Sequence, residues 1–312
     1  FWRLGVSYFG DRIGFLSGGV TFFVMLSLFP TLAAFVTIYG LFADPNDAWG
    51  RLQFLYSFLP SGVARFLGAE MQRLAENTTT TLTFTLVWTL ALSLWTANGA
   101  IKVLFYGLNV AYNEIERRNI IRYNLMCMAF TLTGLMAVLI STSMVVGVPV
   151  VLGVLGLADE WAHLAPLRWP LLLLVYIAVL SVIYRFGPCR QKARWRWLTP
   201  GAIFAAVLTV MLSLAFSWYL QSFMRTRHGC WMLGHKAFLL WTWLSVQIVI
   251  MGAELNAEIE HQTAMDTTTG DERAIGQRGA VVADSVGAKR GSPAALVYTL
   301  KHAEALSNRL LK

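Results

Sequence analysis

The stretch LLWTWLSVQIVIMGAELNAEIEHQ (residues 239–262) decides the fold, because it passes directly from an apolar run into a group of carboxylates. Residues 239–251 carry no charged side chain, whereas Glu254, Glu258 and Glu260 follow within the next three turns of a helix. An apolar run that ends in charged residues is typical of a helix that crosses a bilayer and reaches water at its end. The stretch therefore predicts a membrane-spanning helix with acids at one membrane surface.

The composition of the whole chain agrees with this prediction. Of 312 residues, 56% are apolar and only 13% are charged, and the mean hydropathy is +0.56. A spanning helix needs about 20 mostly apolar residues. Six runs meet this requirement: 15–42, 83–104, 123–147, 169–186, 200–223 and 233–256. Transmembrane β-barrels show short alternating segments instead, so we predict an all-α integral membrane protein, a bundle of six transmembrane helices.

Two further regions complete the predicted organisation. Residues 44–81 place apolar side chains at helical spacing on both sides of Pro60, which predicts an amphipathic helix pair at the outer membrane surface. Residues 1–262 then form the membrane domain, and 263–312 form a polar cytoplasmic tail. The tail is rich in glycine and polar residues, so we expect it to be weakly structured until an amphipathic helix that begins at Ser292.

The distribution of Lys and Arg predicts the orientation, since cytoplasmic connections retain positive charge. Without the tail, one side of the predicted bundle holds ten basic residues and the other holds seven, and the loop 185–196 has five basic residues and no acid. Both termini are therefore expected in the cytoplasm. The formal net charge of +8 points to membrane lipids with anionic headgroups as partners at the cytoplasmic face, and not to nucleic acid.

Polar residues in the second predicted span form one candidate site. Asn98, Lys102, Asn109 and Asn113 fall close to one helical face, and charge inside a membrane is costly unless it is paired or hydrated. One interpretation is that Lys102 snorkels to the inner membrane surface. The other is that these residues line a hydrated path.

The acids at the end of the sixth span form a second candidate site. Acids at a helix C-terminus oppose the helix dipole, so Glu254 and Glu258 are expected to have cationic partners. Arg117 and Arg118 lie on the same predicted side of the membrane. Ion pairs that anchor the helix are the favoured interpretation, and ion or proton coupling is the alternative.

Motifs for catalysis or cofactor binding are absent from the sequence. It contains no GxGxxG, phosphate-binding loop or GxSxG pattern, and its five histidines are scattered without ligand spacing. We therefore predict no enzymatic activity, no cofactor and no metal site. Ala253 and Ala257 present a small-residue face that permits a homo-oligomer.

Four segments together resemble the YihY/BrkB family of bacterial inner-membrane proteins. They are FLSGGVTFFVMLSLFPTLAAFVTIYGLF (15–42), LNVAYNEIERRNIIRYNL (108–125), LTPGAIFAAVLTVMLSLAFSWYL (198–220) and MGAELNAEIEHQ (251–262). The segment ERAIGQRGAVVADSVG (272–287) is similar to the YhjD-like branch. The resemblance implies a multi-pass protein of the bacterial inner membrane, related to virulence or serum-resistance factors. The YhjD-like branch has been linked to movement of lipopolysaccharide precursors, and the older family label, ribonuclease BN, fits no motif in this sequence.

Two functions follow as hypotheses. The first is transport or flipping of a lipid or amphiphile of the cell envelope, with the polar residues around Lys102 as its path. The alternative is a non-transporting scaffold or regulator of envelope assembly, with residues 263–312 as its partner-binding element. A transporter needs a cavity open to water or lipid, whereas a scaffold does not.

Overall fold

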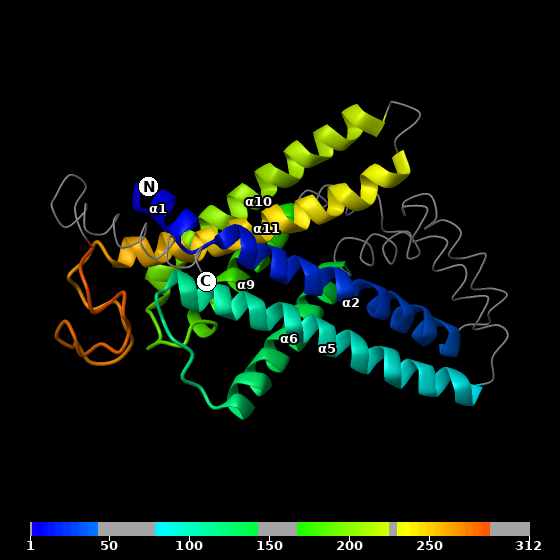
Figure 1. Ribbon diagram of the computed structural model, residues 1–312, viewed down its shortest axis with the longest axis horizontal. Helices are drawn as coiled ribbons and strands as arrows, with labels where there is room; N and C mark the ends of the chain where they lie inside the picture. Colours follow the sequence, from blue (N-terminus) through cyan, green and yellow to red (C-terminus); the bar gives the residue numbers. More distant parts are fainter. Residues whose placement is uncertain (1, 43–78, 143–166, 225–229, 288–312) are drawn as a thin grey trace, which may run out of the picture. The chain divides into compact units, whose positions relative to one another are not determined.

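The computed structural model of the chain describes residues 2–42, 79–142, 167–224 and 230–287, and its regular elements are α-helices (Figure 1). In chain order they are α1 (Trp2–Gly10), α2 (Ile13–Phe42), α5 (Thr79–Ala111), α6 (Ile120–Thr142), α9 (Arg168–Phe186), α10 (Trp195–Met224) and α11 (Cys230–Glu260). The predicted all-α fold is confirmed for these residues. The predicted outer helix pair falls almost wholly outside the described ranges, and the predicted terminal helix lies outside them entirely.

Five of the described helices contain segments long and apolar enough to cross a membrane. These are Val87–Ala111, Ile120–Val138, Trp169–Phe186, Trp195–Tyr219 and Phe238–Glu260. A sixth span results if Leu4–Gly10 and Ile13–Leu28 are counted together, although a bend of 61° separates them. Large apolar side chains such as Trp88, Leu125 and Leu214 point outward and are more than half exposed, as expected where lipid is the solvent. The chain is therefore a multi-pass membrane protein, with five or six candidate spans in its described residues.

The start of α10 differs from the sequence prediction, which placed it at Pro200. The helix begins at Trp195 and runs through the proline. Pro200 removes one N–H group from the second turn, but the hydroxyl of Thr199 donates to the Trp195 carbonyl at 2.9 Å and holds the first turn together. The proline therefore lies inside the helix and does not begin it.

The chain divides into two compact units. Unit 1 comprises Phe1–Ser17, Lys102–Met211 and Ser245–Lys312 as far as these residues are described. Its core joins large side chains of α5 and α9 to small ones of α10 and α11. Fully buried members are Phe105, Leu108, Tyr112, Leu180, Tyr184, Ala202, Ala205, Ile250 and Ala253. The small residues allow α10 and α11 to approach closely, which is the usual packing of helices in membranes.

Unit 2 comprises Gly18–Ile101 and Leu212–Leu244 as far as described. Within it α2 and α5 pack closely, since a Cβ atom built on Gly99 would lie 2.5 Å from the ring of Phe23. The hydroxyls of Thr31 and Ser93 form a hydrogen bond of 2.8 Å between the same two helices. Unit 2 thus has its own interhelical contacts.

Residues 263–287 are folded around a buried arginine, which differs from the weakly structured tail predicted for them. The guanidinium of Arg278, which is 4% exposed, donates to four carbonyls between Ala264 and Ala283 at 2.7–3.1 Å. It also faces the carboxylate of Asp266 at 3.9 Å. Hydrogen bonds to one side chain therefore hold the segment together, beside the buried Ala280, Val282 and Ala283.

This segment packs on the rest of unit 1, beside the end of α11 (Figure 1). Ala193 and Thr268 form an antiparallel bridge, and the backbone N–H of Val281 donates to the carboxylate of Glu114 at 2.8 Å. Burial raises the pKa of Glu114, although the Val281 hydrogen bond and nearby arginines oppose this. Residues 263–287 are thus structurally part of unit 1.

Candidate functional site

The ends of α5, α9 and α11 in unit 1 surround a group of buried polar side chains, which we call the polar cluster. Its members are the buried Tyr112, Arg190, Glu254, Asn256, Glu258 and Glu260 together with the partly buried Asp11. Polar groups are costly to bury unless they are paired or hydrogen-bonded. The contacts that each member makes therefore show what the cluster can do.

An ion pair of Arg190 and Glu260 forms one part of the polar cluster. Their Nη1 and Oε2 atoms lie 2.8 Å apart, and each side chain is only 1% exposed. The Arg190 guanidinium also stands 4.5 Å from the centre of the Tyr112 ring, and Glu260 accepts a hydrogen bond from the hydroxyl of Thr267. Burial raises the pKa of Tyr112 above its usual value, so its phenol stays neutral beside this pair.

Asn256 connects α11 to the beginning of α10. Its Oδ1 atom accepts a hydrogen bond of 2.7 Å from the backbone N–H of Gly201, and its Nδ2 donates to the Leu198 carbonyl at 3.0 Å. The two helix backbones are close enough that a Cβ on Gly201 would lie 2.1 Å from the carbonyl oxygen of Gly252. Asn256 thus links α11 to the backbone of α10 on both sides of Pro200.

The carboxyl groups of Glu254 and Asp11 share a hydrogen bond, and Glu258 lies near them. Asp11 lies at the break between α1 and α2, next to Arg12, whose φ of +52° is unusual outside glycine. The acids therefore join the end of α11 to the bend between α1 and α2.

The residues of the predicted polar path have different surroundings. Asn98 is 6% exposed, and its Oδ1 atom accepts no hydrogen bond from the described residues. Lys102 is half-buried, and its carbonyl accepts a hydrogen bond from the Tyr123 hydroxyl at 3.1 Å. The side-chain amide of Asn109 makes two hydrogen bonds: its Nδ2 donates to the Glu116 carboxylate at 3.0 Å, and its Oδ1 accepts from the Cys189 N–H at 2.7 Å.

Asn113 lies beyond the end of α5, where it is exposed and has a φ of +54°. A residue in this left-handed conformation ends a helix. Asn109 and Asn113 thus have structural tasks, while a path along Asn98 and Lys102 stays a prediction.

The predicted ion pairs of Glu254 and Glu258 with Arg117 and Arg118 are not formed among the described residues. Arg118 pairs with Glu116 at 3.6 Å and donates to the carbonyls of residues 186–188 at the end of α9. The N–H of Arg117 faces the sulfur of Cys189 at 3.4 Å. The physical reason is that the carbonyls at the end of α9 need donors, and Arg118 supplies them.

Sequence reasoning missed Asp11, Tyr112 and Arg190 as members of the polar cluster. Arg190 had a signal, because it lies in the basic loop that contains no acid. Its pairing with Glu260 had none, because the two residues are 70 positions apart in the sequence. Asp11 lacked a signal because its partner lies on a helix at the other end of the sequence.

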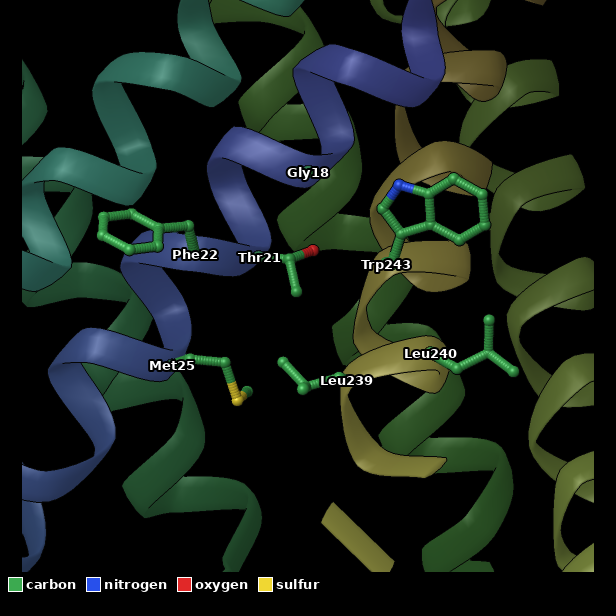
Figure 2. Close-up of a pocket in the computed structure, with 7 residues that line it drawn as sticks. All are labelled: Gly18, Thr21, Phe22, Met25, Leu239, Leu240 and Trp243. Carbon is green, nitrogen blue, oxygen red and sulfur yellow. The ribbon is translucent and has the colours of Figure 1, made fainter. Parts of the chain in front are cut away.

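Unit 2 contains an open apolar pocket between α2 and α11 (Figure 2). Its volume is about 530 Å³, and it is lined by Gly18, Thr21, Phe22, Met25, Leu239, Leu240 and Trp243. Met25 and Leu239 point toward one another between the two helices, while Phe22 and Leu240 lie on either side. Both helices contribute segments that are apolar enough to cross a membrane. The pocket thus offers an apolar surface between two apolar helices.

Metal ligands do not converge in the described ranges, where no three His, Cys, Asp or Glu side chains are arranged to hold a metal ion. The described polar cluster instead offers a buried ion pair and a hydrogen-bonded pair of carboxyl groups.

Comparison with known proteins gives the family. The chain is 26% identical over 248 residues to YfkH of Bacillus subtilis (strain 168), which is described as ribonuclease-like. The alignment covers 77% of this chain and 88% of that protein. No solved structure matches the chain. The family model for virulence factor BrkB matches residues 6–275, which is most of the chain and includes both the polar cluster and the apolar pocket. The chain therefore belongs to the BrkB family of membrane proteins.

Proposed function

We propose that this BrkB family protein binds a lipid or another amphiphile of the cell envelope and moves it across the membrane. The observation that carries the proposal is the apolar pocket between α2 and α11. Phe22, Leu239 and Leu240 line it and are 42–61% exposed. If α2 and α11 both lie in the membrane, as their apolar segments suggest, the medium beside these side chains is hydrocarbon. The apolar part of an amphiphile fits such a surface.

The polar residues of α5 supply a second element of the proposal. An amphiphile carries a polar headgroup, which needs hydrogen-bond donors and charge on its way through the membrane. Asn98 has an unused buried acceptor, and Lys102 is the one cation within the Val87–Ala111 span. We infer that this face of α5 serves the headgroup. The positive-charge count further supports a location in a bacterial inner membrane with both termini in the cytoplasm.

The alternative of a scaffold with a partner-binding tail receives less support. Residues 263–287 use their buried donors and acceptors on one another and on unit 1. These groups are not available to a partner. A nuclease function is suggested only by the name of the relative YfkH, and no group of residues described above supports it.

The test uses a substitution that fills the pocket. A Cβ on Gly18 would meet no atom within 4 Å, so Gly18→Leu extends into open space and reduces the pocket without a clash. Gly134 in α6 is the matched control, because its surroundings are equally open and it lies outside the pocket. Both substitutions also replace glycine by a better helix former.

Purified protein in liposomes with a fluorescent anionic lipid is assayed for transbilayer movement by dithionite quenching. We expect wild type and Gly134→Leu to move lipid faster than protein-free vesicles, and Gly18→Leu to fall to the protein-free rate. Lys102→Ala tests the headgroup face and is expected to slow movement of the anionic lipid. Wild-type protein that moves no lipid or detergent-like amphiphile would refute the proposal, as would equal rates for Gly18→Leu and Gly134→Leu.

A further inference from the structure

Arg185 has hydrogen-bonding capacity that the protein does not use. It lies in the last turn of α9, where its guanidinium stands 4.4 Å from the centre of the Trp195 ring. Its Nε and Nη1 atoms are buried and bond to none of the described residues. Buried donors are paired in the great majority of cases, and an unpaired one calls for a bound water or ion.

Lys192 is a second cation at the same place. Its Nζ atom lies 4.8 Å from the centre of the Phe186 ring, and the guanidinium carbon of Arg185 lies 5.7 Å from the same centre. Within the described residues neither cation has an ion-pair partner. Two like charges that share one aromatic ring repel each other, so an anion near both would lower the energy of this arrangement.

Other cations near Arg185 and Lys192 have partners within the protein. Arg190 is paired with Glu260, Arg118 donates to carbonyls at the end of α9, and Arg194 donates from Nε to the Thr268 carbonyl at 3.0 Å. Their charges or donors serve the fold. Arg185 and Lys192 make only contacts with aromatic rings, which leave their N–H groups available to a ligand.

The position of the two cations identifies the kind of anion. Arg185 lies at the end of the span Trp169–Phe186, and Lys192 lies just before the span that begins at Trp195. The loop between these spans is therefore at a membrane surface, where lipid headgroups carry their phosphates. Trp195 is 48% exposed, as is typical of tryptophans at the membrane interface.

We propose that Arg185 and Lys192, held against the ring of Phe186, bind the phosphate of an anionic lipid headgroup at the membrane surface between α9 and α10. Guanidinium and ammonium groups both form charge-assisted hydrogen bonds to phosphate oxygens. The backbone of Lys192 is fixed for this task, because its carbonyl accepts hydrogen bonds from the N–H and hydroxyl of Thr269. Such a site does not require that the protein moves lipid, so it stands apart from the proposed function.

Native mass spectrometry of the full-length chain in detergent tests the site by binding alone. The protein is titrated with phosphatidylglycerol, with zwitterionic phosphatidylcholine and with inorganic phosphate, and the dissociation constant of the first bound molecule is measured. Arg185→Gln and Lys192→Gln are compared with Arg196→Gln, the matched control. Arg196 is an exposed cation of the same region that stacks 5.5 Å from its neighbour Trp197.

We expect wild type to bind phosphatidylglycerol more tightly than phosphatidylcholine. Arg185→Gln should weaken phosphatidylglycerol binding by about tenfold, the usual worth of a hydrogen bond to a charged group. Lys192→Gln should weaken it by a smaller factor that shrinks at high salt, and Arg196→Gln should leave it unchanged. If Arg185→Gln does not fold, the affinity of Lys192→Gln for phosphatidylglycerol tests the proposal instead. Lys192 is exposed, so its replacement leaves the core intact.

Three results would overturn the proposal. The first is an unchanged affinity in Lys192→Gln and in any folded Arg185 variant. The second is an equal loss in Arg196→Gln, which would indicate a general charge effect. The third concerns the source of the phosphate: inorganic phosphate that binds as tightly as phosphatidylglycerol would assign the site to the free ion.

Discussion

Replacement of Glu260 by glutamine separates the charge of the buried ion pair from its shape. Glu260→Gln keeps the size of the side chain and an oxygen for the Thr267 hydroxyl, but it removes the negative charge 2.8 Å from Arg190. Both side chains are 1% exposed, so water cannot take the place of the carboxylate. Arg190 is then left with the Tyr112 ring at 4.5 Å and with the charge of Glu114 as electrostatic contacts.

The size of the effect follows from these contacts. Loss of one partner of a buried ion pair costs about 3–5 kcal/mol, because the other charge remains buried without compensation. Arg190 keeps its contact with the Tyr112 ring and the attraction of Glu114, so its charge is not wholly uncompensated in the variant. We therefore expect the lower end of the range, about 3 kcal/mol, which is roughly a hundredfold change in the folding equilibrium.

A double replacement distinguishes the ion pair from simple loss of packing. In Arg190→Met/Glu260→Met both charges are gone and the volume is largely kept, so no buried charge is left alone. Apolar replacements of buried ion pairs are often neutral or stabilising. The double variant should therefore be more stable than Glu260→Gln, although it carries more changes.

The assay is unfolding of the purified chain in mixed micelles with a rising fraction of sodium dodecyl sulfate, followed by tryptophan fluorescence. Glu272→Gln is the control, because Glu272 is exposed and surface substitutions stay within about 0.5 kcal/mol. The reasoning is refuted if Glu260→Gln unfolds together with this control. It is equally refuted if the double variant is less stable than Glu260→Gln.

Two further predictions concern the contact of α10 with α11 and the segment 263–287. Gly201→Ala should lower the free energy of unfolding by about 1–3 kcal/mol in the same assay, because its Cβ would lie 2.1 Å from the Gly252 carbonyl. Gly134→Ala, whose Cβ meets open space, should not destabilise the protein. Equal stability of the two variants would contradict this prediction. Burial alone would raise the pKa of Asp266, but hydrogen bonds from Thr268 and Arg273 and the charge of Arg278 lower it below its usual 3.8. Asp266 therefore stabilises the segment above pH 3.8, and this contribution is lost as the pH falls through the depressed folded-state pKa. The measurement is hydrogen exchange of the Thr268 and Arg273 amides, corrected for the intrinsic exchange rate. In wild type the protection of these amides should fall as the pH is lowered. In Asp266→Asn they should be unprotected at every pH.

The membrane-spanning helices could be predicted because lipid selects for long apolar runs regardless of what the helices pack against. The run 169–186 agrees closely with α9 (Arg168–Phe186) for this reason. The beginning of α10 could not be predicted as well, because proline commonly occupies the first turn of a helix. Here the Thr199 hydroxyl and the amide of Asn256 allow the helix to begin earlier.

The polar cluster could be predicted only in part, because helical periodicity shows which face a residue occupies but not which helix lies opposite. Glu254 and Glu258 were identified as acids that need compensation, whereas the partner of Glu254, Asp11, is 243 positions away in the sequence. The fold of residues 263–287 was missed for another reason. The composition of a segment shows how much apolar surface it can bury. It does not show that a single arginine will form hydrogen bonds with four carbonyls, as Arg278 does.

The acids that end α11 have different partners on two faces of the helix. Gly252, Asn256 and Glu260 recur at intervals of four and share one face, which contacts α10 and Arg190. Glu254 and Glu258 share another face, where Glu254 faces the carboxyl group of Asp11. Loss of Arg190 and loss of the Asp11 carboxyl should therefore affect the end of α11 independently, since the two faces use different partners.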